Sequence, residues 1–185
     1  MLRLCEGAVL SYIQQWNSMP ASEAAEAILP CCGSRAWALA LASRRPLSTL
    51  PELLAASDAA WWSLPEADWQ QAFDSHPRIG ERHAPGTATA AALAWSGTEQ
   101  GTAMAAADAT KARLAEGNRA YEAKFSRNFI ICANGKNADE ILHTLDHRLH
   151  STAEAELQEA AEQQRQITHI RLQRWLSERE GAPTA

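Results

Sequence analysis

Helix-start signals recur at almost every segment boundary of this chain, and they constrain its fold more than any other feature. Thr49-x-x-Glu52 and Ser63-x-x-Glu66 match the capping-box pattern, and each carries a proline in the first helical turn. Asn137-x-x-Glu140 and Ser151-x-x-Glu154 match the same pattern nearer the C-terminus. Hardly any stretch shows the strict alternation of a half-buried strand. The sequence therefore predicts an all-α fold.

The same signals predict where the N-terminal helices end. Ser22 precedes an Ala-rich helix that we expect to end at Pro30, and Ser34 is expected to cap a second helix that stops before Arg45-Pro46. A third helix follows Ser63 and leads to His76. In that helix Trp69 and Phe73 are four residues apart, so they share a face that should pack inward.

The C-terminal half is predicted to contain the longest helices. We expect a loop over residues 84–94, a long helix from about Thr98 to Phe125, and a last helix that runs from Ser151 toward Ser177. Residues 1–180 are expected to form one helical domain, and residues 181–185 a frayed tail.

Composition narrows the class of protein. With 185 residues, 46% apolar and 21% charged, the chain has the make-up of one soluble globular domain. A net charge of -5 leaves no basic patch for nucleic acid, and no apolar run approaches the roughly 18 residues of a membrane span. The charged N-terminus gives no secretory signal.

The spacing of the four cysteines, Cys5, Cys31, Cys32 and Cys132, is not that of a metal site. We therefore expect reduced thiols, with Cys132 buried, and a cytoplasmic location.

His76 is the first candidate for chemistry. Pro77 follows it, and because the residue before a proline avoids the α conformation, His76 should lie at a helix end. An imidazole there can handle a proton near neutral pH, and the helix C-terminus is expected to favour its charged form. The alternative is that His76 only caps the last carbonyls of its helix.

A second candidate is the turn Ser96-Gly97-Thr98-Glu99-Gln100. Ser96-x-x-Glu99 matches a capping box at the start of the expected long helix, and free N–H groups at such an end can also hold an anion or a carbonyl. Gln100 adds a donor and an acceptor for an amide edge. Arg171 borders the apolar stripe of the last helix, beside Ile167 and Ile170. It either pairs with a surface acid or points inward to bind a carboxylate or urea-type oxygen.

A rival site is the stripe of His143, His147 and His150, which we call the histidine stripe. Its spacing suits zinc, but helical geometry places it roughly opposite Ile141, Leu142, Leu145 and Leu149, so it should face water or a partner subunit. A metal-dependent hydrolase and a non-enzymatic helical interaction module with a flat apolar surface therefore stay open as alternatives.

Several ordered motifs together resemble the family of 2-oxo-4-hydroxy-4-carboxy-5-ureidoimidazoline (OHCU) decarboxylases of uric acid degradation. They are Cys31-Cys32-Gly33-Ser34-x-x-Trp37, Arg45-Pro46, His76-Pro77-Arg78-Ile79-Gly80, Ser96-x-x-Glu99-Gln100, Tyr121-x-x-Lys124-Phe125, Phe129-Ile130-Ile131-Cys132-Ala133 and Ile170-Arg171-Leu172. Ser126-Arg127-Asn128 departs from the Gly-aromatic-Pro sequence often found before the Phe-Ile stretch.

The resemblance implies an all-helical homodimer that converts OHCU to (S)-allantoin and carbon dioxide without a cofactor or metal. It implies His76 as the catalytic residue, and we hypothesise that Glu99 is catalytic as well, orienting the hydroxyl or ureido nitrogen and assisting proton transfer. It also implies a substrate pocket formed by Pro77, Ser96, Gly97, Thr98, Glu99, Gln100, Phe129, Ile130, Ile131, Cys132, Ala133 and Arg171. The small-molecule substrate already contains an electron sink in its ring, so the protein has only to orient it, exclude water and deliver a proton to one face.

Overall fold

The computed structural model describes residues 11–80, 89–101 and 107–180, and within these ranges every regular element is an α helix. The predicted all-α class is confirmed. The helices are α1 (Tyr12–Ser18), α2 (Ala21–Cys32), α3 (Arg35–Ala42), α4 (Leu50–Trp62), α5 (Glu66–Asp74), α6 (Ala90–Glu99), α8 (Asp108–Phe125), α9 (Ala138–Arg148) and α10 (Ala153–Glu180).

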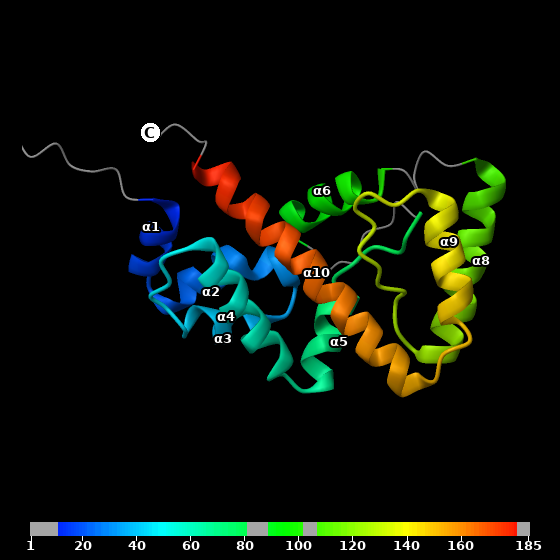
Figure 1. Ribbon diagram of the computed structural model, residues 1–185, viewed down its shortest axis with the longest axis horizontal. Coiled ribbons are helices and arrows are strands. Elements are labelled where there is room, and N and C mark those ends of the chain that lie inside the picture. Colours follow the sequence, from blue (N-terminus) through cyan, green and yellow to red (C-terminus); the bar gives the residue numbers. More distant parts are fainter. Residues whose placement is uncertain (1–10, 81–88, 102–106, 181–185) are drawn as a thin grey trace, which may run out of the picture.

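Helix α10 crosses the middle of the molecule and connects its two parts (Figure 1). It packs against α1, α2, α4 and α5, while α8 and α9 pack against each other on its other side. The first part has a core of large aromatic side chains that includes Trp16, Trp37, Trp61 and Trp175. The second has a separate core around Tyr121 and Leu145. No single apolar centre therefore holds the described helices together.

The non-helical segment 129–133 joins the two cores. Ile130 and Cys132 belong to the first core, whereas Phe129, Ile131 and Ala133 belong to the second. Alternate residues of an extended chain point to opposite sides, so this period-two pattern is the one expected of an extended segment lying between two apolar layers. Its position is consequently fixed from both sides.

Three predicted helix starts are confirmed. The side chains of Ser34, Thr49 and Asn137 accept hydrogen bonds from the backbone N–H groups of Trp37, Glu52 and Glu140. At Asn137 the capping box is complete, because the Glu140 carboxylate also accepts from the Asn137 N–H at 2.7 Å. Trp69 and Phe73 are both buried, as their shared face predicted.

Other predicted boundaries are wrong. Helix α2 continues through Pro30 to Cys32 and ends at Gly33, whose φ of 88° gives the left-handed turn that closes many helices. Ser63 closes α4 by donating to the Ala60 carbonyl, so α5 starts after Pro65 instead. At the start of α10 it is Thr152, not Ser151, whose hydroxyl accepts a backbone N–H.

The long helix predicted from Thr98 to Phe125 is also wrong. Residues 90–99 form α6, which begins at the Thr89 cap, and α8 starts only at Asp108. The predicted loop over residues 84–94 is helical from residue 90 onward, and its residues 84–88 lie outside the described part of the chain. Ser96 and Glu99 therefore lie at the C-terminal end of a helix, which removes the predicted anion-binding N–H groups.

Two further sequence predictions can be compared with the structure. Cys31, Cys32 and Cys132 are free and buried, and burial raises the pKa of each thiol. In the described ranges, no helix is both long and apolar enough to cross a membrane. Cys5 and the predicted tail 181–185 lie outside the described residues.

Candidate functional site

A narrow cavity that is partly open to solvent lies where the two parts of the molecule meet. It is lined mainly by apolar side chains, with His76, Glu99, Gln100 and Asn134 as its polar groups. Small-molecule sites have this make-up, because a mostly apolar wall with a few placed polar groups gives both burial and orientation. The flat surface predicted for an interaction module is therefore not what the structure contains here.

His76 enters the cavity from the end of α5. Just before it, Ser75 packs closely on Gly33, a position where a Cβ atom would lie only 2.1 Å from the Ser75 hydroxyl oxygen. Asn128 donates to the carbonyls of Phe73 and His76, so an amide and not the imidazole caps this helix end. The alternative role predicted for His76 as a helix cap is thus taken by another residue.

The imidazole of His76 is neutral in the folded protein. Only 7% of the residue is exposed. Burial lowers its pKa to about 3, and the positive charge of Arg171 lowers it further, against a smaller raising effect of Gln164. The predicted preference of the helix end for a charged imidazole is wrong, because the cost of burying the charge exceeds the dipole effect.

Glu99 is held by a buried guanidinium. Arg171 Nε donates to Glu99 Oε1 at 3.0 Å and Nη2 donates to Oε2 at 2.8 Å, a two-point contact that fixes the carboxylate plane. The same Nη2 donates to the Ser96 hydroxyl at 2.9 Å. The Arg171 side chain is 1% exposed and that of Glu99 10%, so the pair is well shielded from water. The inward orientation considered for Arg171 is the one found.

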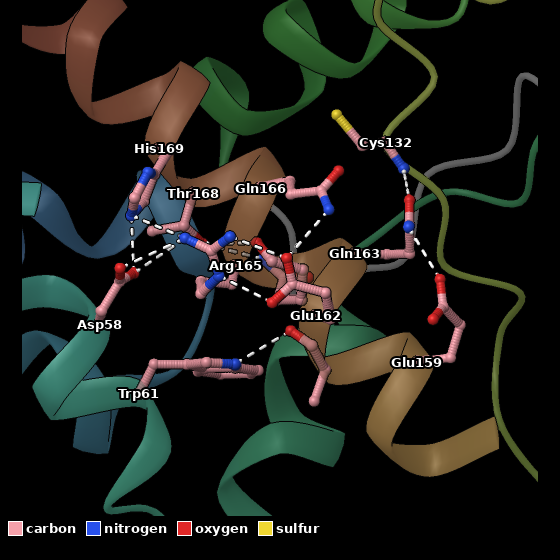
Figure 2. A network of polar contacts seen from close by, with 12 residues as sticks. Asp58, Trp61, Cys132, Glu159, Glu162, Gln163, Arg165, Gln166, Thr168 and His169 are labelled. Atoms are coloured by element: carbon pink, nitrogen blue, oxygen red, sulfur yellow. Dashed lines mark hydrogen bonds and ion pairs between the residues drawn. The ribbon is translucent and has the colours of Figure 1, made fainter. Parts of the chain in front are cut away.

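The wall segment 129–133 is tied to α9 and α10 by side chains. Gln163 accepts the Cys132 N–H at 2.8 Å and donates in turn to Glu159, as Figure 2 shows. Arg148 donates to the Ile130 carbonyl at 2.7 Å. The same figure shows a larger polar cluster around Arg165 farther along α10. The wall is therefore set by specific bonds as well as by packing.

The structure brings together most of the residues that the sequence predicted for the site. His76, Pro77, Glu99, Gln100, Phe129, Ile130, Ile131, Cys132 and Ala133 line the cavity. Arg171 and Ser96 do not line it; Arg171 donates to Glu99 and to the Ser96 hydroxyl instead. Gly97 and Thr98 are exposed and lie outside its wall.

Four lining residues were not predicted: Ile79, Asn134, Ile167 and Ile170. A signal for two of them was available, because Ile167 and Ile170 lie four residues and one residue before Arg171 on the same helix. Ile79 lies within the motif that begins at His76, and Asn134 directly follows the motif that ends at Ala133, yet no local pattern separates a lining residue there from a packing residue.

Within the histidine stripe, His143 and His147 lie on the exposed face of α9 and His150 is exposed just after its end, whereas Ile141, Leu142 and Leu145 are buried. This orientation is the one predicted. Among the residues that the structure describes, no three His, Cys, Asp or Glu side chains are grouped to hold a metal ion.

Comparison with known proteins shows which family has this sequence and fold. Residues 17–173 match the family model described as OHCU decarboxylase. A 2-oxo-4-hydroxy-4-carboxy-5-ureidoimidazoline decarboxylase of Amia calva is 34% identical over 137 residues, 74% of this chain and 77% of that protein. The chain belongs to the OHCU decarboxylase family. This membership confirms the resemblance seen in the sequence motifs.

Other relatives agree with this assignment. The crystal structure of an OHCU decarboxylase in the presence of (S)-allantoin is 33% identical, superposes with a TM-score of 0.68 and covers 80% of this chain and 96% of its own. The uric acid degradation bifunctional protein TTL of Arabidopsis thaliana is 35% identical over 150 residues, 80% of this chain. The chain spans only 46% of that plant protein. The fold is also that of an (S)-allantoin synthase at 21% identity and a TM-score of 0.67, with 88% of this chain and 53% of that chain covered.

Proposed function

We propose that this chain decarboxylates OHCU to (S)-allantoin, as its family membership suggests. The observation that best supports the proposal is the placement of a neutral imidazole, His76, and a fixed carboxylate, Glu99, on the wall of one cavity. The cavity is otherwise mostly apolar, so a bound substrate exchanges water for a preorganised surface.

The substrate carries its own electron sink, so the reaction needs no metal, Schiff base or redox group. When the bond between C4 and its carboxylate breaks, the electron pair moves into the adjacent ring C=N, and carbon dioxide leaves an enol-like intermediate. The ring nitrogen that takes the electron pair gains a proton, the C4 hydroxyl loses its proton, and C5 receives a proton on one face, so one proton is taken up overall. The protein therefore has to accept the hydroxyl proton, allow protonation of the ring nitrogen, deliver a proton to C5 and keep the two faces of the ring distinct.

A neutral imidazole has a free lone pair that can accept the hydroxyl proton, and because its pKa is lowered to about 3, His76 would hold this proton only briefly before passing it on. Glu99 lies on the same wall and is suited to orient the hydroxyl or ureido nitrogen and to assist the proton transfer. The guanidinium of Arg171 is already bonded to Glu99, so we propose that Arg171 fixes this carboxylate instead of binding a substrate oxygen directly. Gln100 and the peptide groups of Ile131 and Ala133 are proposed to bind the ring amide.

Three wider aspects of the proposal concern the whole protein. Residues 1–180 are proposed to act as one domain, the active form is proposed to be a homodimer, and the location is proposed to be the cytoplasm. Light scattering of the purified protein measures the oligomeric state directly, and a mass of one chain, 20.2 kDa, would contradict the dimer.

The activity is tested with purified protein and freshly generated OHCU, by following the optical rotation of the product. We expect His76→Ala and Glu99→Ala each to lose most of the enantioselective formation of (S)-allantoin while their far-ultraviolet circular dichroism stays helical. General acid–base groups commonly contribute about 100-fold to 10,000-fold to a rate, which sets the size of the expected loss.

Matched controls use residues of the same type on the exposed surface. His143→Ala and Glu154→Ala change an exposed imidazole and an exposed carboxylate, so they should keep the wild-type rate. If the wild-type protein gave racemic allantoin at the spontaneous rate, the proposed function would be wrong. If the His76→Ala variant kept full activity while Glu99→Ala lost it, the role proposed for His76 would be wrong and the other roles would stand.

A further inference from the structure

Two buried atoms near the cavity have no hydrogen-bond partner within the described ranges: Nε2 of His76 and Oε1 of Gln164. Gln164 is fully buried on α10, which packs against α5, the helix that ends just before His76. Gln164 Nε2 reaches the Cys32 carbonyl, and the next residue, Gly33, packs against Ser75, which directly precedes His76, so the two side chains lie in the same part of the core. Gln164 also raises the pKa of this imidazole, against the larger lowering effect of burial. A ring N–H and an amide oxygen are complementary, so each supplies the partner that the other lacks.

The orientation of the Gln164 amide is fixed by its other contacts. Nε2 of Gln164 lies 3.4 Å from the carbonyl oxygen of Cys32, which can only accept a hydrogen bond. It also lies 3.3 Å from the Thr168 hydroxyl, which gives its own proton to the Gln164 backbone carbonyl at 2.9 Å. Both contacts require the NH₂ group on this side, so Oε1 must face the other way.

The two nitrogens of the imidazole have different surroundings. Nε2 of His76 is completely enclosed, whereas Nδ1 is not among the enclosed atoms without a partner, and the side chain lines the cavity. A neutral imidazole carries a proton on one nitrogen only. An unprotonated Nε2 beside Oε1 would bring two acceptors together in a dry environment, which is unfavourable for both.

We propose that Gln164 is a positioning residue for His76: its amide oxygen accepts the proton of Nε2, so that Nδ1 is the unprotonated nitrogen presented to the cavity. Helix α10 thereby sets both the tautomer and the ring orientation. This inference rests on the proposed function of His76 as the group that accepts the substrate hydroxyl proton. An imidazole in the other tautomer would present an N–H and could not accept that proton.

The first test is made on the wild-type protein without substrate. A long-range ¹H–¹⁵N correlation spectrum distinguishes the protonated from the unprotonated ring nitrogen of each histidine, and the His76→Gln variant identifies the signals of His76. We expect one tautomer, with the proton on Nε2. A proton on Nδ1, or an equal mixture of both tautomers, would overturn the proposal. This spectrum does not depend on activity, so it can support Gln164 even if the protein fails to act on OHCU.

The second test changes the amide. Gln164→Met keeps the length of the side chain but removes the acceptor, and we expect mixed tautomers at His76 and a fall in kcat of about 10-fold to 100-fold, the usual cost of losing such an outer partner. KM should change little, because Gln164 does not line the cavity. Gln164→Glu retains an acceptor oxygen and should keep the native tautomer and more of the kcat.

The control is Gln173→Met, which makes the same change at an exposed position of α10 and should leave both kcat and the His76 signals unchanged. If Gln164→Met and Gln164→Glu lowered kcat equally, or if Gln164→Met kept the native tautomer and still lost kcat, positioning through the acceptor oxygen would be refuted. Should Gln164→Met fail to fold, the wild-type tautomer and the Glu variant still decide the question.

Discussion

Removing Arg148 is expected to destabilise this protein more than any surface change, because its charge is neutralised in a buried network. Arg148 is 4% exposed and Glu156 only 1%. Arg148 Nε donates to Glu156 Oε1 at 2.9 Å, Nη2 donates to the same oxygen, and the Tyr121 hydroxyl donates to it as well. Glu156 Oε2 has no partner within the described ranges. The carboxylate therefore depends on Arg148 for its compensating charge.

In Arg148→Met the carboxylate of Glu156 stays buried with Tyr121 as its remaining donor, and the Ile130 carbonyl loses its bond to Nη1. Breaking one side of a buried pair costs about 3–5 kcal/mol. For a chain of this length each kcal/mol lowers Tm by about 2–4 °C, so we expect a fall of roughly 6–20 °C. Thermal and urea unfolding followed by circular dichroism measure this loss.

A second substitution separates the buried charge from the loss of packing. Adding Glu156→Gln to Arg148→Met removes the uncompensated charge but keeps an oxygen for Tyr121, so the double variant should be more stable than the single one by about 2 kcal/mol. Arg113→Met is the control, because its pair with Asp146 is exposed and should contribute less than about 1 kcal/mol. If Arg148→Met cost no more than Arg113→Met, or if Glu156→Gln gave no recovery, the reasoning would be refuted.

Three more predictions concern the buried His76, the contact of Gly33 with Ser75, and the histidine stripe. Because the pKa of His76 falls from 6.5 unfolded to about 3 folded, its contribution to stability is complete above pH 6.5 and is lost as pH falls toward 3. Between pH 6 and 4, the free energy of unfolding measured with urea should change by up to about 1.4 kcal/mol per pH unit because of His76, and His76→Gln should remove this contribution. An unchanged slope in the variant would contradict the lowered pKa. Gly33→Ala should cost more than Gly135→Ala, since both glycines have positive φ but only Gly33 meets a neighbour, the Ser75 hydroxyl; equal losses of Tm would exclude the clash. A chelator, or replacement of the whole histidine stripe by glutamine, should leave the rate of allantoin formation unchanged. Inactivation by either would instead support the alternative of a metal-dependent hydrolase.

The helix starts that were predicted correctly are those whose capping groups bond locally. Ser34, Thr49 and Asn137 each bond a backbone N–H three residues ahead, so the sequence spacing contains all the information needed. Ser96-x-x-Glu99 has the same spacing but does not cap a helix start. Its hydroxyl and its carboxylate both bond to Arg171, more than 70 residues away in the chain. The side chains that a capping box needs are therefore occupied by a tertiary contact, which the local spacing cannot reveal.

Most of the residues gathered at the candidate site could be predicted from the sequence, but their geometry could not. The family resemblance predicted most of the residues that line the cavity, because each motif is continuous in the sequence. The protonation state of His76 could not be predicted, since it depends on how completely α5, α10 and the segment 129–133 enclose the ring. The same holds for Arg171, whose inward orientation and pairing with Glu99 depend on how α6 packs near α10.

These electrostatic features together suit the removal of carbon dioxide. In the starting carboxylate the charge is localised on two oxygens, whereas in the transition state it spreads into the ring, so the reaction is favoured by surroundings that do not strongly hold a localised anion. A free guanidinium in the cavity wall would stabilise the starting carboxylate most and slow its departure. The pairing of Arg171 with Glu99 prevents this, and the neutral His76 adds no positive charge. Glu99→Gln should therefore release Arg171 toward the substrate, tightening KM while lowering kcat; a looser KM with unchanged kcat would show that Arg171 does not act in this way.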